Sequence, residues 1–402
     1  MDLSYGKEFE AFRGEVKAFL KASWPPSGAA AQGSKDEQLR RFRELAISKG
    51  YLGRSIPKKY GGSEQAPDPL RGQVIQEEFA AAGAPMEPRG IGMMMLVPTL
   101  LDRGEEWQKE KFVRATLMGE IAWCQGYSEP GSGSDLASLK TRGELVGDEW
   151  VINGQKIWTS SAHEADFMFC LVRTEPNEKK HAGISYLLID MKQPGIDVRP
   201  LREMTGGAMF NEVFFNDVKT PKDWIVGKRG EGWLVSRTTL KHERNSIGNA
   251  GQMTALLDAL VGTAKRRKID GRPAIEDPEI RRRLVEVEGY IRAHQYSGFL
   301  QMTKDLKQES PGVMGLMNKV NSTHIGHRIA KLAMEILGDD GVVAPGERNL
   351  MGAEMDSDST WTNYYMATVG IAIAGGTANV QRNVIAERGL GLPRDTAADR
   401  SK

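Results

Sequence analysis

The sequence predicts an α+β protein in which a central β domain separates two helical segments. Near both ends of the chain, apolar residues recur at helical spacing, as Val16 and Leu20 do. Between about 122 and 230 the period changes to two, and runs rich in Val, Ile, Leu and Phe alternate with turn residues. We therefore expect an N-terminal helical domain at 1–121, a central antiparallel β domain at 122–230 and a C-terminal helical domain at 231–402.

Length and charge limit the class of protein. The chain has 402 residues, enough for two or three domains, because a single core stops growing near about 250–300 residues. The formal net charge of +1 argues against a nucleic-acid-binding protein. No apolar run is long enough to span a membrane and no signal peptide is apparent at Met1, so we expect a cytoplasmic protein. Cys124 and Cys170 are expected to be buried free thiols, and His324 with His327 lacks the further ligands of a metal site.

The first segment is expected to contain several amphipathic helices. One apolar stripe includes Phe9 and Phe12, and another includes Leu39 and Phe42. Farther on, Met93–Met95 forms a run of flexible apolar side chains that suits an adaptable binding surface. Three adjacent residues cannot share one helical face, so at least one of them is expected in the ordinary core.

In the central segment, strands are predicted at 166–173, 184–191 and 210–218. Asn153-Gly154 lies between two apolar runs and predicts a hairpin with a type I′ turn. Because turn residues separate the strands, a barrel or sandwich is expected.

The last segment returns to helical spacing. Ile325, Ile329, Leu332 and Ile336 form an apolar stripe that ends at Gly338, a residue suited to follow a helix.

Residues Tyr127–Asp135 stand out within the central segment. They read YSEPGSGSD and combine hydroxyl groups, two carboxylates and three residues that break regular structure. Such a loop can present backbone N–H groups and hydroxyls to a polar ligand, although its composition also fits an ordinary surface turn.

A second candidate is Glu243. Ser236, Leu240, Glu243 and Ile247 share one face of a predicted helix. A carboxylate among apolar neighbours has its charged form disfavoured, which tunes it as a general base. The alternative is a solvated acid paired with a nearby Lys or Arg.

Two motifs resemble the acyl-CoA dehydrogenase family. Tyr127–Asp135, followed by Leu-Ala-Ser, resembles its first signature, and NGQKIWTS at 153–160 resembles the next conserved segment. The resemblance spans nearly the whole chain. It implies a C-terminal four-helix bundle, bound FAD, a homotetramer or heterotetramer, and an electron-transfer flavoprotein as electron acceptor. The implied reaction removes the α-proton of an acyl-CoA with a carboxylate and transfers the β-hydride to flavin N5, which yields a trans-2-enoyl-CoA.

The resemblance also bears on the base. Most members carry a Glu directly before a C-terminal Gly-Thr, and this chain has Gly375 there. A minority, similar to isovaleryl-type and steroid side-chain enzymes, carry the base on the earlier helix, at the position that Glu243 occupies. The resemblance therefore implies that Glu243 is the catalytic base.

Other site residues are implied individually. Ser128 corresponds to a contact at the N1/O2 edge of the flavin, Trp158 to a ring that flanks it, and Ser160 to a hydrogen bond at N5. Arg267 corresponds to the arginine at the FAD pyrophosphate. The remaining implied residues are Gln125, Tyr127, Thr377 and Asn379 for FAD, and Ser134, Arg244 and Gly376 for the substrate.

Two departures leave alternatives open. Asp270 replaces a frequent Phe, and Asp339 with Asp340 lies in the Gly-rich segment that receives a neighbouring subunit's FAD. Carboxylates there would repel a pyrophosphate unless they point away. The chain could therefore be one subunit of a heteromeric dehydrogenase that is flavin-poor alone. A non-catalytic acyl-CoA-binding protein and a flavin monooxygenase on the same scaffold are further alternatives, against which Glu243 weighs.

Overall fold

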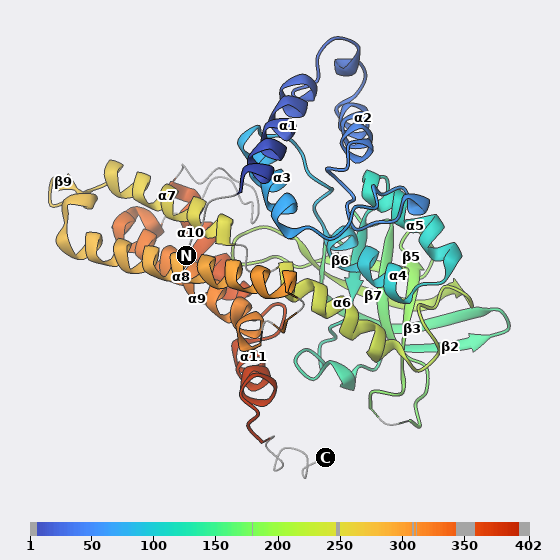
Figure 1. Ribbon diagram of the computed structural model, residues 1–402. Coiled ribbons are helices and arrows are strands. Elements are labelled where there is room, and N and C mark those ends of the chain that lie inside the picture. Colours follow the sequence, from blue (N-terminus) through green and yellow to red (C-terminus); the bar gives the residue numbers. More distant parts are fainter. Residues whose placement is uncertain are drawn as a thin grey trace. The chain divides into compact units, whose positions relative to one another are not determined.

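The computed structural model describes residues 6–178, 180–246, 250–307, 309–310, 312–342 and 358–393 (Figure 1). The chain forms two compact units. The first comprises Met1–Pro200 with Phe210–Thr239, and the second comprises Leu201–Met209 with Leu240–Lys402.

Five α-helices precede the sheet, as the apolar spacing predicts. They are α1 (Lys7–Ser23), α2 (Lys35–Ser48), α3 (Pro69–Ala81), α4 (Val97–Arg103) and α5 (Glu106–Met118). On α1 the buried residues Phe12, Val16 and Leu20 confirm the predicted stripe. Helix α2 begins at a capping box in which Ser34 and Glu37 each satisfy the other's backbone N–H.

The Met-rich run forms a π-helical turn, Gly92–Leu96, directly before α4. Gly92 lies so close to β1 that an added Cβ would stand 2.7 Å from the Trp123 ring. Met95 is buried while Met94 is 36% exposed, so the three methionines divide between faces as predicted. A single π-helical turn often marks a functional site.

One seven-stranded sheet forms the centre of the first unit. Its strands are β1 (Trp123–Gly126), β2 (Arg142–Val146), β3 (Glu149–Ser160), β4 (Phe167–Arg173), β5 (Ile184–Asp190), β6 (Ile196–Pro200) and β7 (Phe210–Pro221). Their order is β1-β4-β2-β3-β7-β6, with β5 also paired to β4. The predicted strands are confirmed and the long pairs are antiparallel. However, β1 pairs with β4 in parallel, and so do Arg142 and Arg173.

The predicted hairpin at Asn153-Gly154 is wrong. Strand β3 continues through both residues, and the chain reverses earlier, at Gly147-Asp148. Asn153 instead exchanges hydrogen bonds with Asp217 on β7, through Nδ2 (2.9 Å) and Oδ1 (2.9 Å). Gly154 lies at a β-bulge with φ of 149°, where a Cβ would stand 2.7 Å from the Thr141 Cα. The glycine is therefore explained by close backbone approach rather than by a turn.

The later part of the chain is helical, with a short hairpin between its second and third helices. Its elements are α6 (Gly232–Ser246), α7 (Ala250–Arg266), β8 (Lys268–Ile269), β9 (Arg272–Pro273), α8 (Pro278–Leu306), α9 (Val313–Leu337), α10 (Asp358–Ile371) and α11 (Ala378–Val384).

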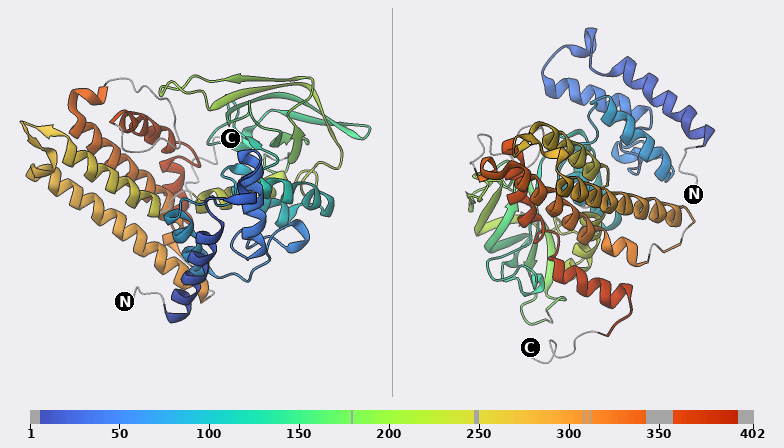
Figure 2. Two further views of the ribbon diagram at one scale, coloured as in Figure 1. Left: turned by 90° about the horizontal axis from the view of Figure 1, so that it is seen from above. Right: turned by 90° about the vertical axis from the view of Figure 1, so that its left-hand side faces the viewer.

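Helices α7–α10 form the expected four-helix bundle. Leu260, Leu284, Ile329 and Trp361, one from each helix, belong to one buried cluster. The predicted stripe on α9 is buried and the helix ends before Gly338, as expected. Figure 2 shows α7 and α8 running alongside each other in its left view.

Cys124 and Cys170 are buried free thiols in the core of the sheet, as predicted. Within the described ranges, no helix has the length and apolar character needed to cross a membrane.

Candidate active site

A buried ion pair organises the loop that follows β1. Lys156 on β3 is fully buried, and its Nζ donates to Glu129 Oε1 at 2.8 Å and to the Tyr127 carbonyl at 3.2 Å. Glu129 also accepts the N–H groups of Lys140 (2.6 Å) and Thr141 (2.9 Å). These bonds hold both ends of the loop against the sheet.

The charge state of Glu129 follows from these contacts. Burial acts to raise the pKa of the carboxyl, but the Lys156 charge and the hydrogen bonds outweigh it and lower the pKa. Sequence reasoning missed this pair. Lys156 follows Ile152 by four residues and Gly154 by two, so the alternation of β3 turns its side chain inward. Because a buried charge needs a partner, this position was the available signal.

The Lys156–Glu129 ion pair and its hydrogen bonds hold the loop so that Ser128 lies beside Trp158. The Ile157 N–H donates to the Ser128 carbonyl at 2.9 Å, so β3 lies along the loop. Between Lys156 and Thr159 the pairing of β3 with β7 slips at a β-bulge. Trp158 lies in this bulge with φ of 60° and is 61% exposed. Bulges of this kind re-aim a side chain, and here the indole packs edge-on against the Phe210 ring of β7, with centroids 6.2 Å apart.

Several polar side chains of β1, the loop after it and β3 lack partners within the described ranges. Thr159 is fully buried, and its hydroxyl makes no hydrogen bond to the described parts of the chain. The side chains of Gln125, Ser128 and Ser160 are partly buried and likewise make no hydrogen bond within the described ranges. Because buried polar groups are nearly always satisfied, these residues suit a planar ligand that carries donors and acceptors.

The outer part of the loop is also fixed. The Ser132 hydroxyl donates to the Asp135 carbonyl at 2.9 Å, and Lys180 Nζ donates to Asp135 Oδ1 at 2.7 Å. Ser134, the expected substrate contact, lies between them and is exposed.

The remaining predicted residues belong to the second unit. Gly375 and Gly376 form a turn with φ of 61° and 93°, and Gln381 Nε2 donates to the Gly375 carbonyl at 3.0 Å. Thr377 caps α11, since its hydroxyl accepts the Val380 N–H at 3.3 Å. Asn379 follows within the first turn of α11.

Arg267 is engaged by a carboxylate. Its Nη1 lies 2.5 Å from Asp340 Oδ2, and a second ion pair joins Arg283 to Glu335. Both acidic residues belong to the segment 335–341, which also contains Asp339. The acidic segment therefore contacts the arginine that was expected to hold a pyrophosphate.

Glu243 lies on α6, which is helical from Gly232 to Ser246. The side chains of Glu243 and Arg244 are outside the described part of the structure, as is Ile247 entirely. Helical spacing places Glu243 on the same face as Thr239, one turn earlier.

The family assignment rests on three sequence matches. Residues 6–120 match the acyl-CoA dehydrogenase N-terminal domain, 124–218 its middle domain and 230–390 its C-terminal domain. The chain belongs to the acyl-CoA dehydrogenase family. It is therefore an oxidoreductase of this family, and the helix–sheet–bundle order described above is the family's architecture.

Relatives within the family match over nearly their whole length. The chain is 37% identical to acyl-CoA dehydrogenase IpdE1 of Mycobacterium tuberculosis, over 97% of this chain and 99% of that protein. Among solved structures, the Tcur3481-Tcur3483 steroid ACAD matches with a TM-score of 0.77 and 29% identity, over 98% and 100% of the two chains. The ChsE4-ChsE5 complex from Mycobacterium tuberculosis matches with a TM-score of 0.76 and 27% identity, over 98% and 100%.

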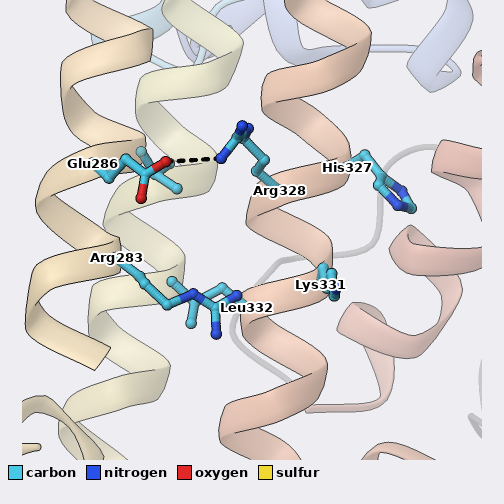
Figure 3. A pocket seen from close by; sticks show the side chains of 7 residues that line it. Arg283, Glu286, His327, Arg328, Lys331 and Leu332 are labelled. Atoms are coloured by element: carbon cyan, nitrogen blue, oxygen red, sulfur yellow. Dashed lines mark hydrogen bonds and ion pairs between the residues drawn. The ribbon is translucent and has the colours of Figure 1, made fainter. Parts of the chain in front are cut away.

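A cavity of about 380 Å³ lies elsewhere, between α8 and α9 (Figure 3). Its lining is largely charged, and Arg328 Nη1 lies 2.9 Å from Glu286 Oε1 across it. The residues that line it are Arg283, Glu286, Val287, His327, Arg328, Lys331 and Leu332. None of them is a residue that the family resemblance assigns to the reaction, so we do not place the chemistry there.

Proposed function

We propose that this chain is a FAD-dependent dehydrogenase that converts an acyl-CoA into the trans-2-enoyl-CoA. The observation that carries the proposal is the Trp158 bulge beside the Ser128 loop. It exposes a large aromatic ring next to polar groups that lack partners, and a flavin has the flat ring and the polar edges that such a surface accommodates.

FAD, when bound, supplies the hydride acceptor. Trp158 would cover one face of its ring, and Ser128 and Ser160 would hydrogen-bond its polar edges, with Gln125 and Tyr127 beside them. The Lys156–Glu129 pair holds this loop in place before any ligand arrives, which reduces the ordering cost of binding. Arg267, Thr377 and Asn379 are proposed as contacts to the rest of the cofactor.

Glu243 is proposed as the base that removes the α-proton. Position 375, the usual place of the base, is a glycine in a turn with φ of 61°, a backbone region that a Glu would occupy only with strain. Helix α6 provides the alternative carboxylate. Ser134, Arg244 and Gly376 are proposed as substrate contacts, and an electron-transfer flavoprotein as the electron acceptor.

The test is an anaerobic titration of the purified protein with a panel of acyl-CoA thioesters of different size. At least one thioester should bleach the flavin absorbance, and the product should be the trans-2-enoyl-CoA. Tight thioester binding without bleaching would instead indicate a non-catalytic binding protein. Steady oxygen consumption in air that depends on an external reductant would indicate a monooxygenase.

A second candidate is one subunit of a heteromeric dehydrogenase. The specific observation in its favour is the contact between Arg267 and Asp340, which places a carboxylate where a pyrophosphate is expected. The names of both similar structures give two components. This candidate predicts a chain that retains little flavin when purified alone and gains flavin in a complex with a related subunit.

A further inference from the structure

Three hydroxyl groups form a buried chain in the first unit. Thr99 Oγ1 on α4 lies 2.9 Å from Thr239 Oγ1 on α6, which lies 3.4 Å from the Tyr186 hydroxyl on β5. The Tyr186 ring in turn packs edge-on against the ring of Tyr127, the residue before Ser128, with centroids 6.3 Å apart and planes at 87°. Thr99, Thr239 and Tyr186 are fully buried, and Tyr127 is 5% exposed.

Thr99 and Tyr186 are also fixed by contacts outside the hydroxyl chain. Thr99 Oγ1 donates to the Met95 carbonyl at 2.7 Å, within the π-helical turn. The Tyr186 ring stacks on Phe169 with centroids 5.9 Å apart and planes 3° from parallel. Burial raises the pKa of Tyr186, so its hydroxyl stays protonated and able to donate.

The hydroxyl chain joins three places that the proposed reaction uses. At one end the Tyr186 ring packs against Tyr127 of the Tyr127–Ser128 loop, at the other Thr99 bonds to the Met-rich turn, and Thr239 in the middle lies on α6. Helical spacing puts Thr239 and Glu243 on one face of α6, four residues apart. Rotating or sliding α6 would break the bonds of Thr239 and, in the same movement, re-aim residue 243.

Packing alone does not explain these side chains. Val and Phe would fill the same volume at 239 and 186 without burying hydroxyls, which are costly unless their geometry is satisfied. The hydrogen-bonded network of Thr99, Thr239 and Tyr186 admits few arrangements, so it fixes the relative position of α4, α6 and β5.

We propose that the hydroxyl chain holds α6 in register with the Tyr127–Ser128 loop, and that Thr239 and Tyr186 are positioning residues for Glu243. The inference rests on the proposed function, because it presumes that Glu243 is the base. It adds two residues that lie outside the family's two signature motifs and that act through the helix rather than on the substrate.

The test uses two substitutions that keep side-chain shape, Thr239→Val and Tyr186→Phe. Each should lower kcat by on the order of tenfold to a hundredfold, because a small displacement of a base is costly, while KM changes by less than about twofold. Thr239→Ser should restore most of kcat. Thr238→Val, one residue earlier on α6 and only partly buried, is the matched control and should leave kcat unchanged.

A double-mutant cycle separates positioning from general loosening. If both hydroxyls act through one network, kcat of the double variant should be at most about threefold lower than kcat of the slower single variant. Independent, multiplicative losses would overturn the proposal. A KM increase with unchanged kcat would also overturn it, because that result indicates lost binding rather than a misplaced base.

Two further measurements do not depend on turnover. Bound FAD per chain should equal that of the unmodified protein in each variant. Backbone amides 240–246 should exchange with deuterium faster in Thr239→Val and Tyr186→Phe than in Thr238→Val; equal exchange would contradict the proposal. If no thioester bleaches the unmodified protein, the proposed function fails. If Glu243→Gln bleaches normally, the assignment of Glu243 as the base fails; if Glu243→Gln is inactive and Thr239→Val is fully active, only this inference fails.

Discussion

Lys156 shows how a single residue supports the site without touching a ligand. It is the only charged group among the largest fully buried side chains of the described residues, and it bonds to both Glu129 and the Tyr127 carbonyl. The motif around it could be read from the sequence. Its partner could not, because Glu129 is 27 positions away and a period-two pattern says nothing of which strand or loop lies opposite.

Lys156→Met should therefore destabilise the protein by about 3–5 kcal/mol, because it leaves the buried Glu129 carboxylate without its counter-charge. Denaturant unfolding followed by tryptophan fluorescence measures the effect. Lys219→Met is the matched control: Lys219 pairs with Glu149 on the surface, where both side chains are at least half exposed, and should cost less than about 1 kcal/mol. Equal losses for the two variants would contradict a structural role for the buried pair.

Trp158 gives a second prediction at this scale. Trp158 has a φ of 60°, which favours glycine, and its ring is mostly exposed. The free energy of unfolding of flavin-free Trp158→Gly should therefore lie within about 1 kcal/mol of that of the original protein. FAD affinity, measured by equilibrium titration of that same apoprotein, should fall. A variant that binds FAD normally would show that the exposed indole does not form part of the cofactor site.

At the scale of elements, β3 is where sequence reasoning failed. Asn-Gly between apolar runs is a strong local hairpin signal, but the register of β3 with β7 was set by non-local contacts. Asn153 forms a hydrogen bond with Asp217 across the sheet, and Gly154 lets the Thr141 backbone approach closely. Local propensity gave way to tertiary contact, as it commonly does in sheets.

Gly154→Ala should accordingly be strongly destabilising, by about 2 kcal/mol or more, because its Cβ would meet the backbone and side chain of Thr141. Gly131→Ala, in the loop after β1, is the control, since a Cβ there has open space. Thermal unfolding of both variants measures the difference. Similar melting temperatures would mean that β3 does not pass Thr141 as closely as described.

The helices were more predictable than the sheet. The stripes on α1 and α9 and the end of α9 before Gly338 follow from spacing and end signals within one segment. The parallel pairing of β1 with β4 does not, because it depends on a long connection that no local pattern encodes.

At the scale of the whole molecule, the proposed site residues divide between the two units. Gln125, Tyr127, Ser128, Trp158 and Ser160 belong to the first, while Arg267, Gly376, Thr377 and Asn379 belong to the second. The sequence motifs predicted both sets, because each motif is local. What the motifs could not predict is the pairing of Arg267 with Asp340, which joins residues 73 positions apart.

That pair gives a prediction for cofactor affinity. Asp340→Asn should tighten FAD binding by the chain alone by up to about fivefold, because it removes a like charge and frees Arg267, and a partly exposed pair is worth at most about 1 kcal/mol. Asp197→Asn, which breaks an exposed pair with Arg199 on β6, is the control. Unchanged or weaker FAD binding in Asp340→Asn would count against the heteromeric alternative.

The measurement that tests the central claim most directly is anaerobic reduction of the flavin by an acyl-CoA in Glu243→Gln. Glu231→Gln, an exposed glutamate just before α6, is the matched control. We expect Glu243→Gln to retain FAD and to lose bleaching by a factor of at least about 10³, while Glu231→Gln bleaches like the original protein. Normal bleaching in Glu243→Gln would contradict the assignment of this residue as the base.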